Sequence, residues 1–218
     1  GRHIVVARFL DHVVPIEIIV PLSDNVVELS GEPRGNFVDG HVLQTLEVLR
    51  LPVSPKADDS AFLRRLALDL TGRLPTPTMQ DEYLRDKDPQ KRTQLVDQLL
   101  SSEEFTEYWT MRFAKLLRIR SQPGDAKAAL TYHAWLKRQI NDGVPYDQFA
   151  RELLTASGDT HQVGPAGFYR TVSGPREQAE FTSEFFMGTR LRCANCHNHP
   201  LDRWTQDDYH GLAAIFAK

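Results

Sequence analysis

The first 22 residues show the hydrophobic pattern of β-strands. The stretch HIVVARFLDHVVPIEIIVPL is rich in Val and Ile, which favour an extended backbone. Asp11 and His12 separate two such runs and are typical of a turn, while Pro15 and Pro21 punctuate the second run. Two strands cannot form a domain alone. We therefore interpret the segment as the tail of a preceding β-sandwich, or as an extension packed on the main body.

Residues 23–36 have the polar and Gly/Pro composition of a linker, and from residue 37 the hydrophobic period becomes helical. The first two predicted helices each carry an apolar stripe. These stripes are formed by Val38, Val42, Leu46 and Leu49, and by Phe62, Leu63, Leu66 and Leu70. Gly72 stands where a helix C-terminus favours glycine.

Local start and stop signals predict the remaining helices. Helices are expected near 77–86, 89–101, from Ser102, near 125–141, from Pro145, near 175–189 and after the capping-box pair Thr205 and Asp208. The Gly- and Pro-rich residues 157–174 are expected to form a long surface loop. The sequence thus predicts a mainly α fold of about eight helices with no strand after residue 36. We divide it into a β segment with linker, 1–35, and a helical domain, 36–218.

Composition limits the classes of function. Among 218 residues, 41% are hydrophobic and 25% charged, which is typical of a globular domain, and the net charge is −3. No cluster of Lys and Arg indicates a nucleic-acid partner, and no apolar run is long enough for a membrane span. The two cysteines exclude a disulfide framework. Because the chain starts at Gly1 inside a predicted strand, we expect it to be a piece of a larger protein.

Both cysteines lie in one short motif, RCANCHNHPLDRW at residues 192–204. Cys193, Cys196 and His197 form the Cys-x-x-Cys-His pattern that attaches c-type haem. In this chemistry each thiol adds to one vinyl group of the porphyrin, and the adjacent histidine becomes an axial ligand of the iron.

Two other kinds of site remain open at this stage. A zinc site could use Cys193, Cys196, His199 and His210, although the spacing of the two histidines is wider than usual. A redox dithiol is the other alternative, although such pairs usually follow a strand and begin a helix.

The residues around the motif are compatible with a haem pocket. Apolar side chains that could cover a ring are Phe181, Phe185, Phe186, Leu191, Leu201 and Trp204, and cations that could meet propionates are Arg190, Arg192 and Arg203. Taken singly, each is better explained as helical core or as a solvated cation. Of these, we select Arg203 and Trp204 as candidate cofactor-binding residues.

Several separated segments resemble a known family. The segments LRCANCHNHPLDRWTQDDYHGLAAIFAK, AFLRRLALDLTGRLPTP and VPYDQFARELLTASGD resemble the planctomycete cytochrome C-like domain family over about residues 36–218. The resemblance implies covalent haem c on Cys193 and Cys196, His197 as an axial ligand, and export to the periplasm or cell exterior. It also implies that the strands at 1–22 end an immunoglobulin-like module of a large secreted protein.

A haem of an electron carrier usually has a second axial ligand. His133 is our candidate, because it shares a predicted helical face with Leu130, Leu136 and Ile140. We expect an electron-transfer domain whose partner is a redox protein or another domain of the same polypeptide. The alternatives are a haem enzyme or gas sensor with an open sixth position, and an interaction module held by a structural zinc.

Overall fold

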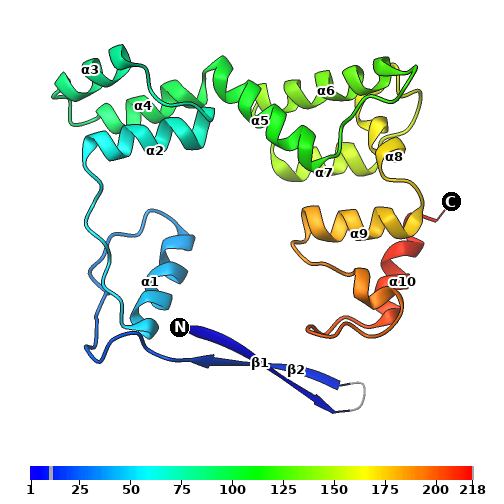
Figure 1. Ribbon diagram of the computed structural model, residues 1–218, viewed down its shortest axis with the longest axis horizontal. Coiled ribbons are helices and arrows are strands. Elements are labelled where there is room, and N and C mark those ends of the chain that lie inside the picture. The colour runs from blue at the N-terminus through cyan, green and yellow to red at the C-terminus, as the bar shows by residue number, and fades with distance from the viewer. Residues whose placement is uncertain (10–11, 218) are drawn as a thin grey trace. The chain divides into compact units, whose positions relative to one another are not determined.

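The protein is mainly helical and has a short two-stranded sheet near its N-terminus, as the sequence predicted. This computed structural model describes residues 1–9 and 12–217 (Figure 1). Contacts divide the chain into two compact units. The first comprises Gly1–Lys56 with Leu191–Gly211, and the second comprises Ala57–Arg190 with the residues from Leu212 on. None of the described helices is both long and apolar enough to cross a membrane.

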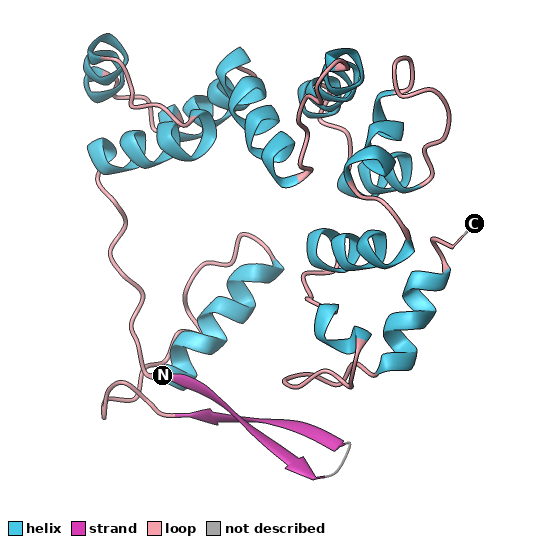
Figure 2. Ribbon diagram, turned by 45° about the vertical axis from the view of Figure 1, so that its right-hand side comes forward, coloured by secondary structure: helices cyan, strands magenta, loops and turns pink. Residues whose placement is uncertain are grey.

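In the described part of the chain, helices predominate and are joined by loops to one another and to the hairpin (Figure 2). The elements are β1 Arg2–Phe9, β2 His12–Ile19, α1 Phe37–Leu49, α2 Asp59–Thr71, α3 Pro77–Arg85, α4 Lys91–Leu100, α5 Glu103–Leu116, α6 Ala126–Asn141, α7 Tyr146–Leu154, the 3-10 turn η1 Gly164–Gly167, α8 Phe168–Thr171, α9 Pro175–Phe186, the 3-10 turn η2 Arg192–Asn195 and α10 Gln206–Ala214.

Strands β1 and β2 form an antiparallel hairpin whose register runs from Arg2 opposite Ile19 to Phe9 opposite His12. Pro15 does not interrupt β2, contrary to the sequence prediction. It pairs with Val6, and a proline is tolerated there because each strand of a two-stranded sheet is an edge strand. Of the two residues of the predicted turn, Asp11 lies outside the described residues, and His12 is the first residue of β2.

Helix α1 begins at a capping box formed by Asn36 and Asp39. Its buried side chain is Leu43, whereas Val38 and Val42, which the sequence placed on the apolar stripe, are about half exposed. The stripe was predicted from spacing alone, and burial depends on where the preceding segment packs. That segment is tied to α1 by a hydrogen bond from the Leu29 N–H to a carboxylate oxygen of Glu47, at 2.7 Å.

A first core of the second unit joins α2, α3 and α4 and contains Leu63, Tyr83, Leu95 and Leu99. The caps predicted for α2 and α3 are confirmed. Gly72 ends α2 with a φ of 68°, and Thr76 accepts the N–H of Met79 at the start of α3.

Helix α4 begins at Lys91, two residues later than predicted. The Asp88 side chain accepts the N–H of Gln90 at 2.8 Å, so the chain closes an Asx-type turn before the helix starts. Pro89 lies in this turn rather than at the first helical position.

A second, larger core of the same unit draws on α5 to α9. Its buried members are Leu117, Tyr132, Trp135, Leu136, Phe149, Leu153, Phe168, Val172 and Phe181. Stacked and edge-on ring pairs run through this core, including Trp135 on Phe149 with centroids 5.3 Å apart. Aromatic pairs of this kind add to the stabilisation from buried area.

The prediction that residues 157–174 form a long surface loop is wrong. This segment contains η1 and α8, and Phe168 and Val172 are fully buried. A Cβ atom added at Gly164 would lie 2.4 Å from the Cβ of Trp135, and one at Gly167 would lie 2.7 Å from the ring of Tyr132. The two glycines therefore let the backbone pack directly against α6. The Gly-rich composition of this segment, which is typical of loops, here allows close packing.

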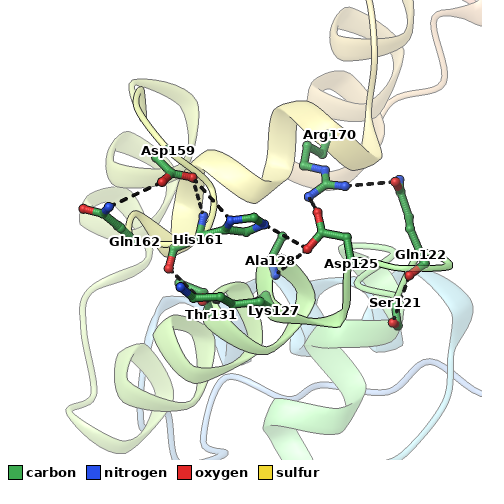
Figure 3. A network of polar contacts seen from close by, with 10 residues as sticks. All are labelled: Ser121, Gln122, Asp125, Lys127, Ala128, Thr131, Asp159, His161, Gln162 and Arg170. Atoms are coloured by element: carbon green, nitrogen blue, oxygen red, sulfur yellow. Dashed lines mark hydrogen bonds and ion pairs between the residues drawn. The ribbon is translucent and has the colours of Figure 1, made fainter.

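A polar network fastens the same segment to the start of α6 (Figure 3). The Asp125 carboxylate caps α6 by accepting the N–H of Ala128, and it also contacts Nε2 of His161 at 2.9 Å and the guanidinium of Arg170. Arg170 in turn donates to the side-chain oxygen of Gln122 at 3.0 Å. Arg170 above all lowers the pKa of Asp125 to about 2, because the hydrogen bond from its guanidinium favours the ionised carboxylate.

The close packing at Gly164 leads to a prediction about stability. Gly164→Ala should lower the free energy of unfolding by about 1–3 kcal/mol, because the new methyl group overpacks the contact with Trp135. Urea denaturation followed by circular dichroism measures this change. Gly40→Ala is the matched control, since an added Cβ inside α1 meets no atom within 4 Å. It should be neutral or stabilising. Equal stability of the Gly164→Ala and wild-type proteins would contradict the packing.

The Asp125 network leads to a prediction about pH. Asp125→Asn preserves the side-chain shape but removes the charge that pairs with Arg170, so it should lower the denaturation midpoint at neutral pH. The lowered pKa of Asp125 means that its stabilisation is present above the usual value of 3.8 and is lost as the pH falls through about 2. The difference between the two proteins should therefore shrink over this range.

Asp81→Asn controls for the loss of a carboxylate, because its pairing with Arg85 is exposed and 3.8 Å long. Denaturation midpoints measured at several pH values decide the matter. A difference between wild type and Asp125→Asn that stays constant down to a pH of about 2 would exclude the charge as its cause.

Candidate functional site

In the first unit, Cys193 lies on the 3-10 turn η2 and Cys196 follows the turn directly. Both cysteines are free and exposed. The turn is held by its apolar residues, since Leu191 is 2% exposed and Ala194 is fully buried. The N–H of Cys196 also reaches the carbonyl of Cys193, at 3.4 Å. An anchored turn thus presents two thiols to solvent.

His197 follows directly and is exposed. Its Nδ1 lies 2.8 Å from the carbonyl oxygen of Asn198. Because a carbonyl oxygen can only accept, Nδ1 must carry the ring proton, and in the neutral ring the lone pair is on Nε2. Histidines that bind metals in proteins commonly donate their other ring N–H in this way.

His199 is held in the opposite manner. Its Nδ1 accepts the N–H of Leu201 at 3.2 Å, so the neutral ring carries its proton on Nε2. Its own N–H donates to the carbonyl of Trp204 at 2.7 Å, which closes a compact loop. The lone pair that zinc would need from His199 is therefore used within the loop.

Geometry also disfavours the zinc alternative. Within residues 1–9 and 12–217, no three or more side chains of His, Cys, Asp or Glu are grouped so that they could hold a metal ion. The set of Cys193, Cys196, His199 and His210 is accordingly not brought together in this structure.

Asn198 connects the imidazole of His197 to α10. Its carbonyl accepts from the ring, and its side-chain oxygen accepts the N–H of Gln206 at 3.1 Å. The capping box predicted for α10 is present: Thr205 N–H donates to Asp208 at 2.9 Å, and Asp208 N–H donates to the Thr205 hydroxyl at 3.2 Å. The Thr205 N–H and the Thr205 hydroxyl, which donates to the same carboxylate at 2.8 Å, lower the pKa of Asp208. Asn198 was not among the residues predicted from the sequence. Its position, next to a histidine and shortly before a predicted helix, is the sequence signal that could have identified it.

The two candidate cofactor-binding residues beside the motif lie together. The guanidinium of Arg203 sits over the Trp204 ring, 5.1 Å from its centroid. The Asp202 carboxylate accepts the backbone N–H of Arg203 at 2.7 Å and the indole N–H of Trp204 at 3.1 Å, so it fixes the Arg203 backbone and the Trp204 ring. Arg203 is exposed and Trp204 is half-buried, so the pair presents a cation beside a partly apolar surface. The hairpin also contacts this loop, since Arg8 donates to the carbonyl of Pro200.

The apolar residues upstream of the motif belong to a core of the second unit. Phe181 stacks on Phe185 with centroids 5.4 Å apart, and Phe185 meets Phe186 edge-on at 4.7 Å. Arg190 donates to Glu184 at 2.9 Å. These contacts agree with the interpretation of each residue as helical core or surface cation.

The predicted placement of His133 on an apolar face is wrong. The buried face of α6 consists of Ala128, Tyr132, Trp135 and Leu136, whereas His133 is exposed. The helical spacing from Leu130 misled the assignment, because Leu130 is itself 68% exposed. Ligation of iron by His133 stays a prediction.

Comparison with known protein families identifies the family of this chain. Residues 37–218 match the model of a planctomycete domain family that is associated with cytochromes c. The chain belongs to this family, PSCyt2, described as a protein of unknown function (DUF1549). Comparisons with curated proteins and with solved structures gave no match.

Proposed function

We propose that this chain is a c-type haem domain that transfers electrons within a larger secreted or periplasmic protein. Haem is attached through Cys193 and Cys196, and His197 is an axial ligand. The observation that carries the proposal is the backbone hydrogen bond at Nδ1 of His197, which leaves the Nε2 lone pair for a metal beside two free thiols.

Covalent attachment requires accessible, reduced thiols. Each S–H would add across one vinyl C=C bond, with a new S–C bond at one carbon and the hydrogen at the other, so no group leaves. Exposure of Cys193 and Cys196 on an anchored turn suits this reaction. The bound haem would supply one-electron exchange, while the chain supplies the tether, the ligand and the polar surroundings.

Arg203 and Trp204 suit the edge of such a group. The exposed guanidinium provides charge for a propionate, and the half-buried indole provides apolar contact. Asp202 holds the indole through its N–H and fixes the backbone of Arg203 by accepting the backbone N–H of that residue.

Location and partners follow from the same chemistry. Covalent haem is attached outside the cytoplasmic membrane, so the proposal includes export. The electron donor or acceptor is a separate redox protein or another domain of the same polypeptide.

Two histidines two residues apart provide a matched test. After expression in a host with a periplasmic haem-maturation system, the wild-type protein should hold one haem that survives acid–acetone extraction. His197→Ala should change the absorption spectrum through loss of an axial ligand, whereas His199→Ala should leave it unchanged. Cys193→Ala and Cys196→Ala should each sharply lower the yield of haem-loaded protein.

The opposite results are equally clear. The proposal would be overturned in favour of a structural metal if the wild-type protein from this host held stoichiometric zinc and no haem, and if His199→Ala lowered the zinc content. A wild-type protein that contains neither haem nor zinc would overturn both.

His133→Ala tests the predicted second axial ligand. Because His133 is exposed, its removal should cost little stability, and any spectral change can be assigned to ligation. If His133 is a ligand, the haem should become high-spin and bind carbon monoxide rapidly. An unchanged spectrum would remove His133 from the ligand set, and a wild type that is already high-spin would favour a haem enzyme or gas sensor.

A further inference from the structure

A cleft of about 900 Å³ opens in the second unit beside the C-terminal half of α5, the start of α7 and α9. Its size lies within the range of small-molecule sites. None of the residues that line the cleft belongs to the cysteine motif, since all of them lie between 111 and 185. An aromatic wall and a basic rim account for its chemistry.

Phe185 is at the centre of the aromatic wall. Its ring stacks on Phe181 at 5.4 Å and meets Phe113 edge-on at 6.2 Å. The Tyr146 hydroxyl donates to the Phe185 carbonyl at 3.2 Å, which fixes the tyrosine beside the wall. Phe113 and Phe185 are half-buried rather than buried, so part of each ring faces the cleft.

The basic rim consists of Arg112, Lys115 and Arg118, which follow one another at three-residue spacing. Arg118 pairs with Glu177 at 3.3 Å. Glu184, the acidic residue of the lining, is paired with Arg190 at 2.9 Å. Among the described residues, Arg112 and Lys115 form no ion pair with any carboxylate, so the rim carries two uncompensated positive charges.

The backbone at Arg118 is left-handed, with a φ of 56°. This conformation favours glycine and is strained for a branched or long side chain. Arginine at this position places its guanidinium over the Phe181 ring, 5.6 Å from the centroid. A third cation is thereby held against the aromatic wall at some cost in backbone strain.

We propose that this cleft binds a planar aromatic anion of small-molecule size. The ring of the ligand packs against Phe185 and Phe113, and its carboxylate meets Arg112 and Lys115. Apolar contact with the wall supplies affinity, and the cations select a negative charge. The proposal uses no residue of the cysteine motif.

Isothermal titration of the full chain with 2-naphthoate and with neutral 2-naphthamide tests the site. The carboxylate should bind more tightly than the amide. Arg112→Gln and Lys115→Gln should each weaken naphthoate binding about fivefold, the effect of an exposed ion pair, and should leave naphthamide binding unchanged. Phe185→Leu should weaken the binding of both compounds. Arg85→Gln, an exposed cation on α3, is the matched control and should change neither.

Arg118→Gly separates binding from folding. Glycine relieves the left-handed strain, so the variant should be at least as stable as the wild type by thermal denaturation while it binds naphthoate more weakly. Equal affinity for naphthoate and naphthamide, or naphthoate binding that is unaffected by Arg112→Gln and Lys115→Gln, would overturn the proposal and leave a solvated surface cleft. Absence of naphthoate binding to the folded wild type would overturn it as well.

Discussion

Direct packing of backbone against helix α6 is the contact on which the larger core depends. Gly164 and Gly167 bring a 3-10 turn so close to Trp135 and Tyr132 that a methyl group would not fit. This approach lets the following residue, Phe168, enter the core, where it meets Phe181 at 5.2 Å. The Asp125 carboxylate then holds the same segment at its rim. A stretch rich in glycine and proline thus becomes the element that closes the core.

Features encoded by neighbouring residues could be predicted from the sequence. Ser102, Thr76 and the pair Thr205 and Asp208 cap helices through hydrogen bonds that span three residues, and these caps are present as expected. The order of helices and the early strands follow from hydrophobic period for the same reason. Each of these features can be predicted without knowing which residues pack against it.

Features that depend on distant partners could not be predicted. Glycine is common both in surface loops and where backbone packs closely on a helix. At Gly164 and Gly167, only the position of α6 shows that close packing is the reason. His133 has helical spacing to Leu136, yet the larger rings of Tyr132 and Trp135 determine which face is buried. At the motif, the order of cysteines and histidine could be read from the sequence, whereas the opposite protonation of the His197 and His199 rings arises from backbone hydrogen bonds.

Burial of Ala194 has a consequence for how motifs of this kind are recognised. The two residues between the cysteines are usually treated as a spacer of free composition, but here the first is completely enclosed and the second is half-buried. A large or charged residue at the first position would displace the turn, and both thiols would move with it. In this fold the spacer is therefore part of the scaffold, and a search by cysteine spacing alone would accept sequences that the fold would reject.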